Sequence, residues 1–317
     1  MHTRPLASAC LAALFLAVPL QAFPAQAQQP AQQQARPAQD QGLRAAITKS
    51  NAYIGLMNRT IRASEAWGRY ASWVNMKTGP TGKERYIAYG IYSLYDVRSE
   101  IAAARQAADA PPASAELDAT MKRFIAAYEA FAPLITLASG YYERQDYRAD
   151  NMAEGKSLHA RMVPAAETFL KEQKLLDAQF RPFKADVDRQ ELASLEAAHG
   201  KRERWHMKNV MIHARNVLDV LPTNAAPVVD LAMFDPVLNS FATAVKDMDV
   251  YATENPGKFS SFEGRPRSLL GKLREFRDKL AKAKGDARRG AANDLQWIVN
   301  DYNTMITISD VTIRTMR

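Results

Sequence analysis

The sequence predicts an all-α fold, an elongated antiparallel helical bundle of about seven or eight helices. Two observations support this prediction. Apolar residues recur at a spacing of three to four along most of the chain, as on one face of a helix. The period-two alternation that is typical of strands, bounded by hairpin dipeptides, is absent from the sequence.

The first 27 residues have the features of a secretory signal peptide. A basic start at Arg4 precedes an apolar run from Leu6 to about Leu20, and Ala25-Gln26-Ala27 forms a small-residue cleavage site. The run is shorter than the roughly 20 residues of a membrane-spanning helix. We therefore expect cleavage near Ala27 and a mature periplasmic protein that does not span the membrane.

The single cysteine, Cys10, lies inside the apolar run, which is a poor position for lipid attachment, so we do not expect a lipoprotein. Cleavage after Ala27 would leave a mature chain without a thiol, which excludes disulfides and cysteine metal ligands. Residues 28–42 are rich in Gln, Ala and Pro and predict a disordered tether. Residues 43–317 are the predicted helical domain.

Four helices are expected in the first part of this domain. The first covers about 43–74 and carries a stripe of isoleucine and methionine. The second covers about 82–108, where Thr81 and Glu84 form a T-x-x-E capping box at its start. The third covers about 114–142 with Ser114 as its N-cap, and the fourth covers about 150–180.

Four more helices are expected in the second part. The fifth covers about 184–221 and ends before Pro222. The sixth opens at Asp235-Pro236, an N-cap followed by proline in the first turn, and reaches about residue 253. A basic helix begins near Pro266, and the last helix begins near Asp286 or Asn293.

Two segments resemble ligand motifs only in part. KTGPTGKER, residues 77–85, has Lys77 where a phosphate-binding loop needs its first glycine and Glu84 where it needs a hydroxyl, so we interpret it as a turn between helices. His206 and His213 are about 10.5 Å apart along a helix, too far to share one zinc ion, and have no third ligand at helical spacing. We expect no metal site and no cofactor.

Charge is concentrated near the C-terminus. Removal of Arg4 with the signal lowers the formal net charge from +8 to +7. Residues 258–289 contain eleven basic and four acidic residues. This stretch is either a solvated helix face or a surface that is attracted weakly to anionic envelope polymers. No nucleic-acid-binding motif is recognisable, so we expect no nucleic-acid partner.

Tyrosine is concentrated in the first half of the chain, with ten of twelve between residues 53 and 147. Tyr86, Tyr89, Tyr92 and Tyr95 repeat at a spacing of three, which drifts by about 60° per step around a helix, so they cannot all face one core. They are either aromatic packing residues with wet hydroxyls or a platform for a sugar or peptide.

YYERQDYRADNMAEGKSLH, residues 141–159, allows three interpretations. It can be a join between two helices, loosened at Gly140 and capped by Asp146 or Asp150. It can be a catalytic centre with Asp150, Glu154 and His159 as acid and base, although no serine elbow or metal triad accompanies them. It can also be one face of a binding cleft, made of Tyr141, Tyr142, Tyr147, Asp150 and His159 with Arg85 and Tyr89 from the facing helices.

Several segments together resemble the YiiG family of bacterial envelope proteins, which is built around a domain of unknown function. These are NAYIGLMNR at 51–59, RYASWV with GPTGKER and YGIYSLYD at 69–96, the 141–159 segment, and HMKNVMIHAR at 206–215. The resemblance implies an exported helical protein without an established activity, catalytic residue or cofactor. Family members often carry a lipoprotein signal, which this chain lacks.

The function expected from the sequence is a non-enzymatic binding or interaction module of the cell envelope. No catalytic residue is assigned. The expected partner is an envelope protein, a peptide or a glycan. The alternative is a periplasmic hydrolase that uses carboxylates and a histidine around residues 146–159.

Overall fold

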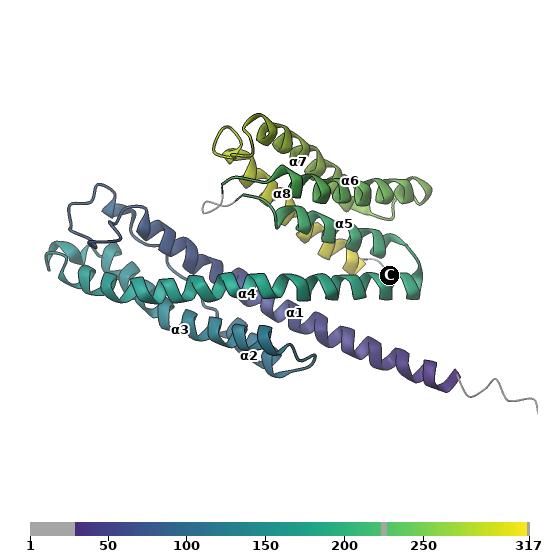
Figure 1. Ribbon diagram of the computed structural model, residues 1–317, viewed down its shortest axis with the longest axis horizontal. Coiled ribbons are helices and arrows are strands. Elements are labelled where there is room, and N and C mark those ends of the chain that lie inside the picture. The colour runs from purple at the N-terminus through teal and green to yellow at the C-terminus, as the bar shows by residue number, and fades with distance from the viewer. Residues whose placement is uncertain (1–28, 223–226, 316–317) are drawn as a thin grey trace, which may run out of the picture. The chain divides into compact units, whose positions relative to one another are not determined.

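Figure 1 shows the computed structural model of the protein, which describes residues 29–222 and 227–315. The predicted signal peptide, residues 1–27, lies outside the described residues. The chain divides into two units, residues 1–42 and 43–317. The second unit contains seven complete helices and the C-terminal part of α1.

The described residues form eight α-helices and no β-strand, which confirms the all-α prediction. Three short 3-10 helices lie between them, at Ile87–Tyr89, Asp146–Arg148 and Ser260–Phe262. The α-helices are α1 (Gln29–Ala71), α2 (Arg98–Asp109), α3 (Ala115–Glu143), α4 (Ala153–His199), α5 (Glu203–Leu218), α6 (Leu231–Glu254), α7 (Gly264–Lys282) and α8 (Ala292–Thr315).

The start of α1 differs from the prediction. The helix begins at Gln29, so the segment that the sequence predicts as a disordered tether, residues 28–42, is helical from Gln29 onward. The disordered tether is predicted only because residues 28–42 have almost no large apolar side chain to bury. Alanine, glutamine and arginine are also among the strongest helix formers, and this intrinsic preference favours the helix.

The second unit has two hydrophobic cores. The first is built from α1, α2, α3 and α4, with α3 and α4 packed along each other. The second is built from α5, α6, α7 and α8, with α5 and α6 packed along each other. Helix α4 belongs to the first core and also contacts α5, so it links the two cores (Figure 1).

The predicted break between a fourth and a fifth helix at residues 180–184 is wrong. Helix α4 is continuous through Pro164 and Pro182, and the chain turns at Gly200, which has a φ of +72° that suits glycine. A proline inside a helix costs about 3 kcal/mol. Phe180 and Val187 are buried on either side of Pro182, and their burial offsets that cost.

The predicted helix at 82–108 forms only in its last part, as α2. One of the two hydrogen bonds of the capping box is present, because the Glu84 carboxylate accepts from the Thr81 backbone N–H. The same carboxylate also accepts from the Thr81 hydroxyl at 2.7 Å and from the Gly82 N–H at 2.8 Å. These bonds close a turn that no α-helix follows, since only the short 3-10 helix Ile87–Tyr89 lies between it and α2. Gly82 and Gly90 both have positive φ, at +84° and +58°, which interrupts helical geometry.

Other predicted ends are close to the structure or displaced by a few residues. Ser114 is the N-cap residue of α3, but its side chain makes no capping hydrogen bond. Helix α6 starts at Leu231 rather than at 235, and the Asp230 carboxylate caps it by accepting from the Ala232 N–H at 2.9 Å. Pro236 therefore lies inside α6.

A buried ion pair fastens α1 to α3. The ammonium of Lys49, which is 1% exposed, lies 2.9 Å from both carboxylate oxygens of Asp118. The Tyr53 hydroxyl donates to the same carboxylate at 2.6 Å, and the Ser114 N–H donates to it at 2.9 Å. Asp118 also lies in the first turn of α3, where the helix dipole favours a negative charge.

One described helix, α3, is long and apolar enough to cross a membrane by length and composition. Many of its apolar side chains, among them Phe124, Phe131 and Ile135, are buried in the first core, although Leu137 is exposed. The packing of a core helix is therefore sufficient to explain its composition.

We expect Asp118→Asn to destabilise the mature protein by about 3–5 kcal/mol, because it leaves the Lys49 ammonium buried without a counter-ion. Urea unfolding followed by circular dichroism measures the change. Asp109→Asn is the matched control, since Asp109 pairs with Lys122 at an exposed position. Equal unfolding midpoints for the two variants would show that the buried pair contributes no more than the exposed one.

Candidate functional site

The segment 141–159 joins the end of α3 to the first turns of α4. Tyr141 and Tyr142 are each 4% exposed and belong to the first core. The Tyr142 ring meets Trp73 edge to face at 5.0 Å and Tyr141 at 5.1 Å. Tyr147 is half-buried against this core. The burial and ring contacts of Tyr142 make it a packing group, whereas Tyr141, although 4% exposed, also lines a shallow surface pocket.

Asp150 caps the start of α4. One carboxylate oxygen accepts from the Tyr141 hydroxyl at 2.8 Å and from the Met152 N–H at 2.9 Å, and the other accepts from the Glu154 N–H at 3.0 Å. The Glu154 N–H bond is the main reason why the pKa of Asp150 is lowered. This is the cap that the helix-join interpretation predicts.

His159, on α4, holds the 79–82 turn against the helix. Its Nδ1 lies 3.0 Å from the Tyr70 hydroxyl. Its ring stands so close to Gly79 that a Cβ on this residue would lie 3.0 Å from the ring, and Gly79 also has a φ of +76°. Burial lowers the pKa of His159, and a hydrogen bond with the Met76 backbone opposes this shift.

The groups of the hydrolase alternative bond to different partners. A shallow pocket of about 340 Å³ has Asp150 and Glu154 in its wall, next to the ion pair of Arg144 with Asp146. His159 does not line this pocket and bonds to Tyr70. The geometry therefore favours the helix join over an acid-base centre.

The other two predicted binding residues, Arg85 and Tyr89, lie elsewhere, on a surface that we call the arginine-tyrosine strip. It is formed by four tyrosines of the 86–95 loop, three arginines of α1 and Arg85. Its members are Tyr86, Tyr89, Tyr92, Tyr95, Arg59, Arg62, Arg69 and Arg85. The Arg59 guanidinium lies 5.0 Å from the Tyr95 ring centroid, Arg62 4.1 Å from Tyr92, and Arg69 4.5 Å from Tyr89.

The strip forms because the loop runs along α1. The Trp73 indole donates to the Gly90 carbonyl at 2.9 Å, and Arg62 and Arg69 donate from Nε to the Ser93 and Tyr89 carbonyls at 3.3 and 3.4 Å. Ile91 and Val97 are buried beneath the loop. The spacing of three that the sequence shows thus places tyrosines on the outer side of an irregular segment instead of around a helix.

The strip combines exposed rings with positive charge. Tyr86, Tyr89 and Tyr95 are 42%, 52% and 51% exposed. Arg59 and Arg62 pair with Glu100 and Glu65, whereas none of the ion pairs in the described part of the chain includes Arg69 or Arg85. Tyr86 and Tyr89 stack at 5.1 Å beside these two arginines. Sequence reasoning missed the strip as a unit, since its three arginines on α1 lie 20 or more residues from the rings that they contact.

Many cations of residues 258–289 are paired. Arg267, Lys272, Arg277 and Lys279 reach carboxylates on other elements, and Arg288 and Arg289 pair with Asp286. The excess charge that the sequence shows is therefore partly neutralised within the fold. The described residues contain no group of three or more histidine, cysteine, aspartate or glutamate side chains that could hold a metal ion.

Comparisons with known proteins match this chain to relatives without an assigned activity. A family model described as "Protein of unknown function (DUF3829)" matches residues 44–307. The chain is similar to "Uncharacterized protein YiiG" of Escherichia coli (strain K12), with 25% identity over 273 residues, covering 81% of this chain and 76% of that protein. The resemblance read from the sequence is confirmed. No solved structure matches the chain.

We expect Tyr142→Ala to lower the free energy of unfolding by about 3–5 kcal/mol, as for other large core residues. Tyr89→Ala, at the exposed strip, is the matched control and should leave stability nearly unchanged. Thermal and urea unfolding measure both. A stable, folded Tyr142→Ala protein would show that this ring is not part of the core packing.

We expect stability to fall as the pH falls through about 6.5, the ordinary pKa of histidine. Burial lowers the pKa values of His159, His206 and His213, so the folded state takes up fewer protons than the unfolded chain in this range. The loss levels off below the folded pKa values. An NMR titration in which the His159 ring titrates at or above its ordinary pKa would contradict this assignment.

Proposed function

The chain belongs to the DUF3829 family of proteins of unknown function, and we propose that it is an exported, non-enzymatic interaction module that binds an acidic protein segment on the arginine-tyrosine strip. Export to the periplasm is supported by the N-terminal sequence, with Arg4, the apolar run and Ala25-Gln26-Ala27 in the order of a signal peptide. The interaction role is supported by the strip itself.

The observation that carries the proposal is the exposure of two tyrosine rings, Tyr86 and Tyr89, next to two arginines that have no carboxylate partner among the described ion pairs. Tyrosine and arginine are enriched among the residues that dominate protein interfaces. Each strip ring already contacts a guanidinium, so its orientation is restricted before a partner arrives. Such preorganisation lowers the entropy cost of association.

An acidic protein segment fits the strip better than a sugar does. Sugar rings stack on free aromatic faces, whereas Tyr86 and Tyr89 already contact each other and the guanidinium groups of Arg85 and Arg69. The hydroxyl groups of these tyrosines and the N–H groups of Arg69 and Arg85 donate no hydrogen bond to a carboxylate in the described part of the chain. Groups of this kind can donate to the carboxylates and backbone carbonyls of a partner, and the uncompensated charge at Arg69 and Arg85 favours an anion.

The experiment uses the full chain, expressed with its signal. Osmotic shock should release a mature protein that begins at or near Gln28. Its affinity is then measured for a fluorescent peptide of Glu, Asp and Leu and for the matched Gln, Asn and Leu peptide. We expect the acidic peptide to bind at least about tenfold more tightly, with an advantage that shrinks as salt is raised.

The variant Arg69→Gln/Tyr89→Ala should weaken binding of the acidic peptide by about tenfold or more, a change of about 1.4 kcal/mol. The matched control Arg274→Gln/Trp297→Ala removes the same charge and an exposed aromatic ring from other helices. Equal weakening by both pairs would overturn the role of the strip, and so would equal binding of the two peptides. A chain that keeps Met1 and stays in the cytoplasm would overturn the proposed export.

A further inference from the structure

A cavity of about 710 Å³ lies where α1, α4, α5 and α8 meet, and none of the residues that line it belongs to the strip. Its size falls within the range of small-ligand pockets. One side is apolar, with Ile54 and Met57 of α1, Phe180 of α4 and Ile306 of α8. The other side carries charged groups of α4 and α5. A ligand for this cavity therefore needs an apolar body and polar ends.

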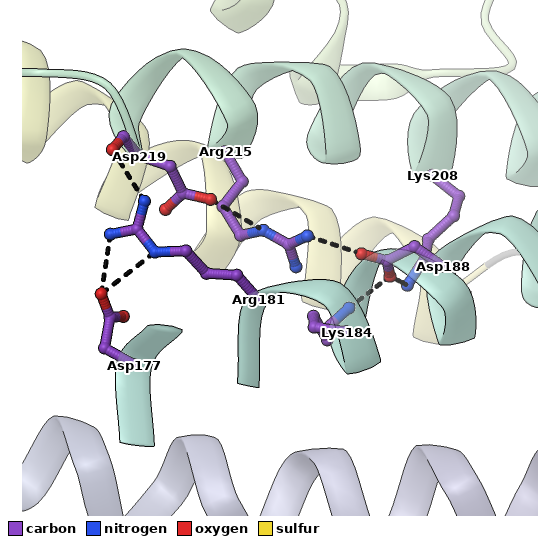
Figure 2. A network of polar contacts seen from close by, with 7 residues as sticks. All are labelled: Asp177, Arg181, Lys184, Asp188, Lys208, Arg215 and Asp219. Atoms are coloured by element: carbon purple, nitrogen blue, oxygen red, sulfur yellow. Dashed lines mark hydrogen bonds and ion pairs between the residues drawn. The ribbon is translucent and has the colours of Figure 1, made fainter. Parts of the chain in front are cut away.

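Figure 2 shows that one ion pair of the cavity is closed. Arg181 donates to one oxygen of Asp177 from Nε at 3.0 Å and from Nη2 at 2.8 Å. Its Nη1 donates to the backbone carbonyl of Asp219 at 3.2 Å. All three nitrogens of this guanidinium therefore have a partner inside the protein, and the Arg181-Asp177 pair has little left to offer a ligand.

The second pair, Arg215 with Asp219, is open. Arg215 donates from Nη2 to the buried Asp188 at 2.8 Å, and this bond sets the position of the guanidinium (Figure 2). Its Nε is 3.9 Å from the Asp219 carboxylate, which is beyond hydrogen-bonding distance. The Asp219 side chain accepts no hydrogen bond from any described residue, and burial raises its pKa. Each member of this pair can accept a ligand group of opposite charge.

The ion-pair network to which the cavity wall belongs is balanced. Four cations, Arg181, Lys184, Lys208 and Arg215, are connected to four carboxylates, Asp177, Asp188, Glu191 and Asp219. Asp188, Glu191 and Lys208 belong to this network without lining the cavity. A ligand with a single charge would bring an uncompensated charge into a half-buried site, which is costly. A ligand with both charges would leave the balance unchanged.

We propose that this cavity binds a small zwitterion, a free amino acid or dipeptide with an apolar side chain, whose ammonium lies at Asp219 and whose carboxylate lies at Arg215. The apolar side chain packs against Ile54, Met57 and Ile306. Tyr302, also in the cavity wall, supplies a neutral hydroxyl donor, since burial raises its pKa to about 12. This site is independent of the strip and of its proposed partner.

Isothermal titration of the mature protein tests the proposal with four probes: leucine, leucyl-leucine, leucinamide and 4-methylpentanoate. Leucinamide lacks the carboxylate and 4-methylpentanoate lacks the ammonium. We expect at least one of the two zwitterions to bind about tenfold or more tightly than either singly charged probe. The comparison of leucine with leucyl-leucine distinguishes an amino acid from a dipeptide.

Asp219→Asn should weaken zwitterion binding by about tenfold or more and leave 4-methylpentanoate unaffected, because only the ammonium site is changed. Asp249→Asn, at an exposed ion pair on α6, is the matched control. The proposal would be overturned if neither leucine nor leucyl-leucine bound more tightly than leucinamide and 4-methylpentanoate, or if neither zwitterion gave heat at millimolar concentration. These probe comparisons need no variant, so they decide the question even if Asp219→Asn fails to fold.

Discussion

The buried carboxylate of Asp188 fixes how α5 lies on α4, and the second core depends on that placement. Asp188 is 1% exposed and is held by Lys184 of its own helix and by Lys208 and Arg215 of α5 (Figure 2). Lys208 and Arg215 are seven residues apart, two helical turns on one face, so both reach the carboxylate in only one register of the two helices. A slip of α5 would leave a buried charge without partners, at a cost of several kcal/mol.

The two buried aspartates of the fold differ in what they leave for function. Asp118 is satisfied by Lys49, Tyr53 and the Ser114 N–H, and these groups have no other acceptor to serve. Asp188 shares Arg215 with Asp219, and one guanidinium that is held at Asp188 cannot also come within hydrogen-bonding distance of Asp219. The constraint that orders the α4-α5 contact thus produces the open ion pair of the cavity, whereas the α1-α3 contact is purely structural.

Sequence patterns predicted the fold class, the family and the existence of most helices, because these depend on periodicity and composition. They also predicted the Asp150 cap, which is a local interaction. They failed where tertiary contacts outweigh local rules, as at Pro182 inside α4 and in the glycine-interrupted 82–97 segment. The strip and the cavity could not be read from the sequence, since both bring together side chains that are far apart in the chain, from Ile54 to Ile306 in the cavity.

The tyrosines of the first half divide into two groups according to what their hydroxyls contact. Tyr53, Tyr70 and Tyr141 are buried, and their hydroxyls bond to Asp118, His159 and Asp150, so each ties one helix or turn to another. The strip tyrosines have their rings against guanidinium groups, and none of the hydrogen bonds among the described residues uses their hydroxyls. Tyr86, Tyr89 and Tyr95 are therefore oriented without being needed for the core, whereas Tyr92 also packs against it. A recognition surface requires this combination of fixed rings and free polar ends. Tyrosine can therefore stabilise the fold at 141–142 and remain available to a partner at 86–95.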